Sequence, residues 1–272
     1  MLFNKRENCF YGQLILTGAV FLFALINIVT IKDGHNWGDD FSSYIVHAGN
    51  LIDHRPYAAG IMLDNAVVYP PGFPLLIAPL IKILGVHYKA LKLLNVVLWY
   101  LSVFIWYPIF SKRLGERWAV LCCLFLCASY FFFIFKQNVI SEIPFFFFMS
   151  LTVLSFTKYI ADSSQLKHCL LAMIFMALSL SIRSAGLILF VSAIFYLLAI
   201  RRDWKAGLYF VLSLVLISAL QSYLVGITPG FFSVLLKASH GMVLANIFML
   251  SKKAAAYSFV YSFKTGPWRR WR

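Results

Sequence analysis

The chain has 272 residues, of which 61% are hydrophobic and only 12% are charged, and its mean hydropathy is +0.81. This composition excludes an ordinary soluble domain and predicts helices that lie in a lipid bilayer. The net charge of +14 does not indicate a nucleic-acid-binding protein, because the basic residues are scattered between apolar segments instead of gathering on one soluble face. We therefore expect an all-α, polytopic membrane protein without a nucleic-acid partner.

The first apolar segment, residues 13–31, follows two basic residues, Lys5 and Arg6. It lacks a small-residue cleavage site and is longer than the core of a typical signal peptide, so we interpret it as a retained membrane anchor. The positive-inside rule places the basic N-terminus in the cytoplasm. Residues 32–88 then form the first outer loop.

This loop contains two adjacent acids, Asp39 and Asp40. Neighbouring carboxylates repel each other, and beside a bilayer this repulsion must be offset by solvent, a cation or a bound ligand. The pair therefore predicts a site, and a divalent cation beside it is one interpretation. The alternative is a solvated turn in which Asp40 caps the following helix. We expect no dedicated metal centre, because the loop histidines are 12 and 7 residues apart, which matches no tight ligand motif: His35, His47 and His54.

The end of the loop contains a short apolar stretch, Phe73–Gly85. It is too short to cross a bilayer and is expected to form a helix in the outer interface. The basic segments 111–117 and 201–205 then both face the cytoplasm, as the positive-inside rule requires. Including the first anchor there are about seven spans, and the later six are expected near residues 90–110, 118–135, 143–160, 167–182, 185–200 and 205–226.

Three isolated polar residues then fall at the outer ends of spans: Lys136, Glu142 and Arg183. Arg183 interrupts a long apolar stretch, so it must lie where the chain turns back or bear a burial cost of several kcal/mol. Taken singly, Arg183 would serve to anchor a turn to lipid phosphates, and Glu142 would complement the dipole of its helix. Together with the acidic pair, they predict a site at the outer face.

The domain organisation expected from these patterns has two parts. Residues 1–227 form the transmembrane core, and residues 228–272 form an outer-face or interfacial tail that ends in KTGPWRRWR. This short ending suggests a truncated chain. No P-loop, GxGxxG or GxSxG motif is present, so nucleotide chemistry is not indicated.

Several short motifs follow one another in a recognisable order: DDFSSY at residues 39–44, YPPGFP at 69–74, SEIP at 141–144 and IRSAG at 182–186. This order resembles the GT-C class of membrane glycosyltransferases, in particular the protein O-mannosyltransferase and aminoarabinose-transferase superfamily. The resemblance implies an enzyme that uses a polyprenyl-phosphate sugar donor and needs no cofactor. It also implies a lipid, glycan or protein acceptor at the outer face and direct displacement of the lipid phosphate.

The resemblance also implies roles for individual residues. Counting back from Tyr44 matches Asp40 to the family's general base and leaves Asp39 as an additional acid and an alternative base. The family's Pro-Pro pair matches residues 70–71, where Tyr69 replaces a basic residue found in several members. Arg183 and Lys136 are then candidates to hold the lipid phosphate. The expected substrate-binding residues are Tyr44, Tyr69, Lys136, Glu142 and Arg183.

The resemblance places the chain in a bacterial inner (plasma) membrane, with its active site on the outer face. Two other interpretations stay open. A transporter or flippase-like protein would have ionisable groups within its helices, whereas these charges lie at helix ends. A catalytically inactive, truncated remnant is the second, because the family usually has more spans than this chain.

Overall fold

The computed structural model describes residues 5–34, 40–60 and 69–225, and describes only the backbone of residues 5–11 and 40. In this part of the chain all regular secondary structure is helical, which confirms the predicted all-α fold. The described residues belong to one compact unit, residues 1–227. The elements are α1 (Lys5–Val29), α2 (Asp40–Ile52), α3 (Gly72–Leu84), α4 (Tyr88–Leu114), α5 (Glu116–Cys127), α6 (Tyr130–Phe135), α7 (Glu142–Ala161), α8 (Leu166–Ile182), α9 (Gly186–Phe195), the π-helix η1 (Tyr196–Arg201) and α10 (Trp204–Val225).

Five segments of the described chain are long and apolar enough to cross a membrane. They are Gly12–Val29, Tyr88–Leu114, Glu116–Phe135, Glu142–Ala161 and Trp204–Val225. The predicted fifth and sixth spans correspond to α8 and to α9 with η1, which are shorter apolar helices. At about 1.5 Å per residue, a 17-residue helix such as α8 reaches about 25 Å, the lower limit for a span. The count of seven spans therefore stays a prediction.

The third predicted span is interrupted in the structure. Helix α5 ends at Cys127, and α6 begins at Tyr130 after a short break. The Ser129 side chain accepts a hydrogen bond from the Phe132 backbone N–H at 3.4 Å, which caps the new helix. The two pieces together still form one membrane-length segment.

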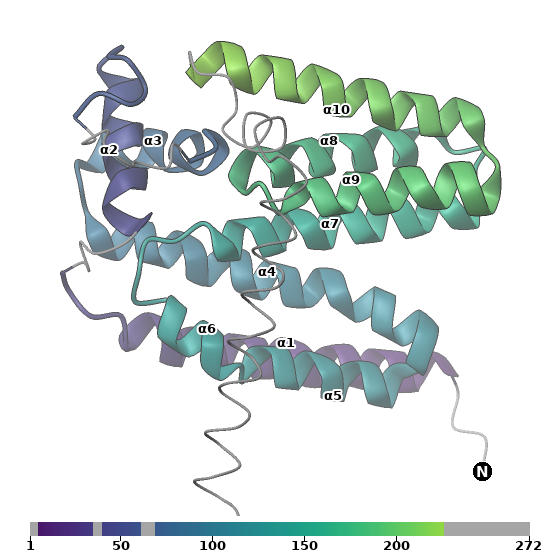
Figure 1. Cartoon of the computed structure of the whole chain (residues 1–272). Coiled ribbons are helices and arrows are strands. Elements are labelled where there is room, and N and C mark those ends of the chain that lie inside the picture. Colours follow the sequence, from purple (N-terminus) through teal and green to yellow (C-terminus); the bar gives the residue numbers. More distant parts are fainter. Residues whose placement is uncertain (1–4, 35–39, 61–68, 226–272) are drawn as a thin grey trace, which may run out of the picture. The chain divides into compact units, whose positions relative to one another are not determined.

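The helices form two neighbouring groups, one with α1, α4, α5 and α6 and the other with α7, α8, α9 and α10 (Figure 1). Helix α4 packs against α1, α5 and α7, and α7 packs in turn against α8. Helices α9 and α10 follow beside α8, while α2 and α3 pack together near the start of α4. The expected position of α3 in the membrane interface stays a prediction.

Helices α2 and α3 bury a small apolar core. It contains Tyr44 and Ala48 of α2 and Phe73 and Ile77 of α3, each with no more than 3% of its surface exposed. Ile182, the last residue of α8, belongs to the same core. Helices α2 and α3 are therefore joined through apolar packing to the end of α8.

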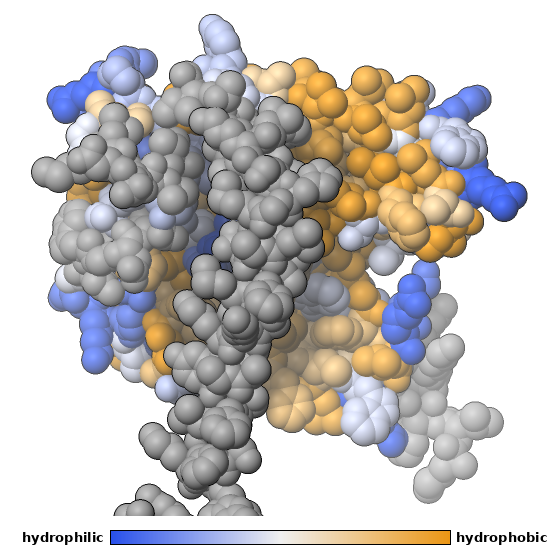
Figure 2. All heavy atoms as spheres, viewed as in Figure 1, coloured by the Kyte–Doolittle hydropathy of each residue, from blue (hydrophilic) through white to orange (hydrophobic). Residues whose placement is uncertain are grey.

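Most of the remaining helix surface is apolar. Figure 2 shows broad hydrophobic areas over the helices, with hydrophilic residues gathered toward the helix ends. Many large apolar side chains are exposed, among them Phe125 at 79% and Leu216 at 70%. An exposed apolar surface of this extent is stable in contact with lipid, so the structure is that of an integral membrane protein.

Candidate functional site

Four polar residues from three helix ends meet at one place, which we call the Arg183 cluster: Tyr44, Ser141, Glu142 and Arg183. The Tyr44 and Ser141 hydroxyl oxygens are 2.9 Å apart and share a hydrogen bond. Arg183 donates a hydrogen bond from Nη1 to Ser141 Oγ at 3.2 Å and forms an ion pair with Glu142. The structure thus brings together Tyr44, Glu142 and Arg183, three of the residues predicted to bind substrate, although they lie 41 to 139 residues apart in the sequence.

The local sequence explains where two of these charges lie. Glu142 is the first residue of α7, where the helix dipole stabilises a carboxylate. Arg183 follows the last residue of α8 and has extended backbone angles, φ −144° and ψ 139°. Its side chain is one-third exposed and that of Glu142 is 43% exposed, so the pair remains open to a ligand. Pairs of this exposure contribute on the order of 1 kcal/mol or less.

Ser141 joins the two sides of the cluster. It occupies the N-cap position of α7, yet its side chain makes no capping hydrogen bond. The hydroxyl is fully buried and instead contacts both Tyr44 and Arg183. Its role was missed from the sequence, although SEIP was one of the motifs singled out, because a serine at a helix start usually predicts a cap.

Two glycines allow the end of α8 to sit close to its neighbours. A Cβ atom added to Gly72 would lie 2.5 Å from the carbonyl carbon of Ser181. One added to Gly186 would lie 2.5 Å from the backbone nitrogen of Leu180. These distances are too short for any side chain, so the glycines of YPPGFP and IRSAG are required by the same packing. They fix the turn of α8 that precedes Arg183.

An aromatic group lies beside the cluster. The Tyr44 ring is 5.0 Å, centroid to centroid, from the rings of both Tyr69 and Phe73. The backbone carbonyl of Tyr69 accepts a hydrogen bond from the Tyr57 hydroxyl at 3.0 Å. The Tyr69 side chain, also predicted to bind substrate, is partly exposed next to Tyr44. Aromatic rings in this setting can pack against the apolar face of a sugar.

The loop that holds Tyr57 is attached to α2 by His47. Nδ1 of this histidine and the Tyr57 carbonyl oxygen are 2.7 Å apart, and the two rings stack at 4.1 Å. Burial lowers the pKa of His47, which favours the neutral ring. With Nδ1 as donor to the carbonyl, His47 serves to hold the loop in place.

Lys136 does not join the Arg183 cluster. Its ammonium group is fully buried, hydrogen-bonds to the Asn27 carbonyl and the Thr30 hydroxyl, and lies 3.9 Å from the centre of the Phe133 ring. These groups belong to the end of α1 and to α6. Because they occupy the ammonium group, the structure gives no support to the expected contact of Lys136 with a phosphate.

Lysines instead hold the segment that leads toward the acidic pair. Lys92 is 2% exposed and donates hydrogen bonds to the carbonyls of Lys32 and Gly34 at 2.8 and 2.7 Å. Lys89 pairs with Asp33 at 2.9 Å. Both contacts lie in the segment that follows the end of α1 at Val29. Sequence reasoning missed this role of Lys92.

The acidic pair is only partly covered by the structure. Asp39 lies outside the described residues, and so does the side chain of Asp40. Asp40 begins α2, which places it one helical turn before Tyr44. Their catalytic roles therefore stay predictions. Among the described residues no three His, Cys, Asp or Glu side chains gather as metal ligands, and the interpretation of a cation beside the acids is untested.

Comparison with known proteins identifies the family. Residues 68–225, more than half of the chain, match the family described as dolichyl-phosphate-mannose-protein mannosyltransferase. No curated protein and no solved structure matches the chain. The matched region includes Tyr69, Ser141, Glu142 and Arg183 and begins after the acidic pair. The chain therefore belongs to the dolichyl-phosphate-mannose-protein mannosyltransferase family, whose members are GT-C membrane glycosyltransferases that take a sugar from a lipid-linked donor.

Proposed function

We propose that this protein transfers a sugar from a polyprenyl-phosphate donor to an acceptor hydroxyl or amine at the outer face of a bacterial inner membrane. Mannose is the first sugar to test, because the family description names it. The observation that carries the proposal is the hydrogen-bonded line from Tyr44 through Ser141 to Arg183. It joins the helix that begins with Asp40 to the only arginine at the end of α8.

Arg183 is the proposed ligand of the donor phosphate. A guanidinium group binds phosphate and carboxylate oxygens through the same forked geometry. The carboxylate of Glu142 therefore holds the position that a phosphate oxygen would take. Because this ion pair is partly exposed, displacing it costs little compared with the charge-assisted hydrogen bonds that a phosphate gains.

Asp40 is the proposed general base, with Asp39 as a second acid beside it. The base removes the proton of the acceptor hydroxyl, whose oxygen then attacks the anomeric carbon. The bond from that carbon to the phosphate oxygen breaks, so polyprenyl phosphate leaves and the anomeric centre is inverted. Negative charge grows on the departing phosphate, and Arg183 would stabilise it there.

The test is transfer of labelled mannose from a polyprenyl-phosphate donor by the full chain in lipid nanodiscs. Asp40→Asn should lower turnover by about 10²- to 10⁴-fold, the usual contribution of a general base. Asp39→Asn should cost less. Asp53→Asn is the matched control, because Asp53 is a half-exposed surface carboxylate paired with Arg55 and should leave turnover unchanged.

Each outcome of this test has a defined meaning. A larger loss with Asp39→Asn than with Asp40→Asn would move the base by one position. Unchanged transfer in both variants of an active preparation would contradict the proposed mechanism. A wild-type chain that is inserted and folded but inactive with several lipid-linked sugars would contradict the proposed function.

A further inference from the structure

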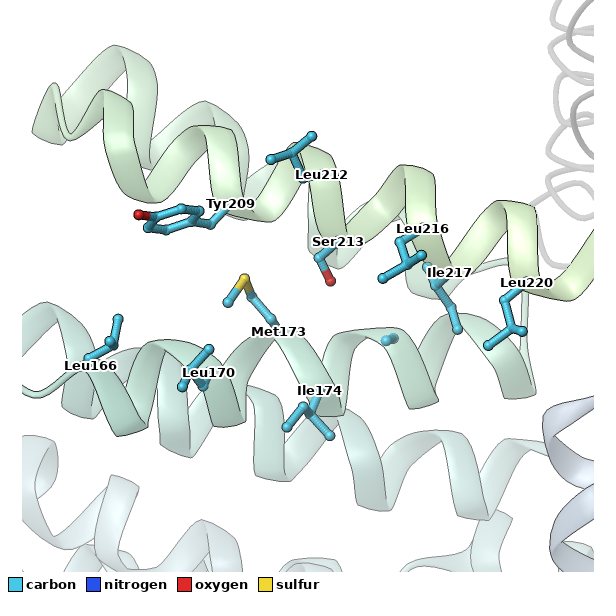
Figure 3. Close-up of a pocket in the computed structure, with 11 residues that line it drawn as sticks. Leu166, Leu170, Met173, Ile174, Tyr209, Leu212, Ser213, Leu216, Ile217 and Leu220 are labelled. Atoms are coloured by element: carbon cyan, nitrogen blue, oxygen red, sulfur yellow. The ribbon is translucent and has the colours of Figure 1, made fainter.

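Buried polar contacts are unevenly distributed over the described helices. The pocket between α8 and α10 is lined mostly by aliphatic side chains, and its polar lining residues are Tyr209 and Ser213 (Figure 3). Near the end of α1, in contrast, two lysines are each no more than 2% exposed, Lys92 and Lys136. Lysine is seldom buried so completely, because removing its charge from water is costly. Both lysines donate hydrogen bonds to residues 30–34, which we call the post-α1 segment.

Gln137 holds the post-α1 segment through two further hydrogen bonds. Its side-chain Nε2 donates to the Thr30 carbonyl at 2.7 Å, and its Oε1 accepts from the Lys32 backbone N–H at 2.9 Å. The Lys32 carbonyl in turn accepts a hydrogen bond from Lys92 at 2.8 Å. Both polar groups of the Lys32 backbone are therefore bound by side chains from distant parts of the chain. The segment is fixed in this way although it belongs to no helix.

A short connector, residues 136–141, joins α6 to α7 and contacts several elements at once. Lys136 binds the carbonyl of Asn27 in α1. The Asn138 carbonyl accepts a hydrogen bond at 3.2 Å from an asparagine side chain of α4. Val139 is fully buried in the apolar core of α2 and α3. Because it is attached to four helices, the connector can serve as a fixed reference for the residues that it binds.

The connector contacts the chain on both sides of the acidic pair. Before the pair, Gln137 binds the post-α1 segment. After it, Ser141 shares a hydrogen bond with Tyr44, which lies one helical turn beyond Asp40. The same Ser141 hydroxyl accepts a hydrogen bond from Arg183. The proposed base and the proposed phosphate ligand are thus both linked to one short stretch of chain.

We propose that Gln137 and Lys92 are positioning residues for sugar transfer, which act by holding the post-α1 segment so that Asp40 is directed at the acceptor. Fixing the chain on both sides of a residue lowers the entropy that must be lost when that residue takes one position. A base must lie within hydrogen-bonding distance of the proton that it removes, so a small displacement slows the chemical step. This inference rests on the proposed function and names residues that set the placement of its base.

Two variants release the post-α1 segment in the full chain in nanodiscs. Gln137→Ala removes both hydrogen bonds of the side-chain amide, and Lys92→Met replaces the ammonium group with an apolar side chain of similar length. Each should lower kcat for mannose transfer by up to about 10²-fold, the effect of a displacement of about 1 Å. The Kd for labelled polyprenyl-phosphate mannose should stay at the wild-type value, because Arg183 is unchanged. Turnover is expressed per donor-binding chain, so that unfolded protein does not lower it.

Two further variants separate positioning from packing. Lys92→Arg keeps a cationic donor for the two carbonyls and should retain more turnover than Lys92→Met. Gln165→Ala is the matched control for Gln137→Ala, because Gln165 is a loop glutamine whose Nε2 donates to the exposed Asp162 carboxylate at 2.6 Å. This control should leave turnover and donor binding unchanged. Equal losses in Lys92→Arg and Lys92→Met would assign Lys92 to packing and overturn its positioning role.

Hydrogen–deuterium exchange measures the hold on the post-α1 segment without requiring sugar transfer. Peptides that cover residues 30–34 should exchange faster in Gln137→Ala and Lys92→Met than in the wild-type chain, because the bonds that fix the segment are lost. Gln165→Ala should exchange there like the wild type. Unchanged exchange in both releasing variants overturns the inference, whatever the activity of the protein.

The remaining outcomes distinguish this inference from the proposed function. Unchanged turnover in both releasing variants of an active protein overturns the inference and leaves the proposed function standing. A loss of donor affinity as large as the loss of turnover also overturns it, because the two residues would then act on the donor site. A wild-type chain that binds the donor but transfers no sugar overturns the proposed function, and with it the base that these residues would position.

Discussion

At the scale of single residues, the charge, the orientation and the exposure of Arg183 all suit a residue that binds a phosphate. It is ion-paired with Glu142 and hydrogen-bonded to a buried serine, so its side chain is already oriented. It is also one-third exposed, which leaves part of the guanidinium accessible. A buried lysine such as Lys136 has the charge but not the access. This difference decides which cation is the better candidate for a phosphate ligand.

Replacing the guanidinium tests this assignment. Arg183→Lys keeps the charge but loses the planar fork, so the KM for the polyprenyl-phosphate donor should rise roughly tenfold, as expected for one lost charge-assisted hydrogen bond. The KM is measured by initial-rate transfer at fixed acceptor concentration. Arg55→Lys is the control, because the Arg55 side chain is 65% exposed and pairs with surface Asp53. An unchanged donor KM in Arg183→Lys would remove Arg183 from the binding site.

At the scale of elements, the end of α8 is positioned by its neighbours. Gly72 of α3 and Gly186 of α9 both approach its backbone more closely than a side chain allows. Ile182 packs in the same core as Tyr44 of α2. Contacts with α2, α3 and α9 therefore fix the position of the end of α8.

A methyl group at Gly72 should disturb this arrangement. The Gly72→Ala Cβ would lie 2.5 Å from backbone atoms of Ser181, so α3 or α8 must shift. A shift of about 1 Å at a substrate-positioning group can cost about 10²-fold in rate, and overpacking costs about 1–3 kcal/mol of stability. Sugar transfer and the thermal unfolding midpoint measure the two effects.

The control for this variant is Gly49→Ala in α2. An added Cβ there has open space around it, and alanine is favoured over glycine inside a helix by about 1 kcal/mol. Gly49→Ala should therefore preserve both transfer and stability. A Gly72→Ala protein that behaves like this control would show that the end of α8 adapts without loss.

At the scale of the whole molecule, the described helices place charge at two opposite ends. Helix α4 runs for 27 residues, about 40 Å, from the region of α2 and α3 to the basic Lys112 and Arg113. The other end of α7 is tied to the end of η1, since Arg201 donates a hydrogen bond to the Ile160 carbonyl at 3.0 Å. The basic segments thus gather at the end opposite the Arg183 cluster, as the positive-inside rule predicts for a cytoplasmic face.

Cysteine labelling in intact cells tests the sidedness. In a cysteine-free background, a membrane-impermeant maleimide should label Arg55→Cys from outside, because Arg55 is exposed beside α2. Leu114→Cys, 51% exposed at the far end of α4, should label only after permeabilisation. Labelling of both positions from outside would contradict the threading, because α3 would then have to cross the membrane as well as α4.

Much of the helical fold was predictable from the sequence. The spans expected near 143–160 and 205–226 correspond to α7 at Glu142–Ala161 and α10 at Trp204–Val225. An apolar run bounded by charges largely fixes where a helix begins and ends. The backbone must satisfy its own hydrogen bonds in lipid, and charged residues avoid the hydrocarbon. The break between α5 and α6 was not predicted, because Ala128 and Ser129 interrupt the apolar run only weakly.

The candidate site was predictable only in part. Tyr44, Glu142 and Arg183 were proposed from their residue types, their expected place at helix ends and the family resemblance, and the structure brings them together. The sequence suggested Lys136 as a fourth member, but the side chain turns toward α1. A lysine beside a helix end has several acceptors within reach, and only the packed structure selects among them.

The sequence by itself determined the membrane class, the helices and the side of the molecule on which polar residues gather, because these properties depend on local hydropathy and charge. Tertiary structure decided which of these residues are partners. The contacts among Tyr44, Ser141 and Arg183 join residues 42 to 97 positions apart. No local pattern encodes such pairings, since they arise when α2, α7 and α8 pack and each buried polar group must find a hydrogen-bond partner.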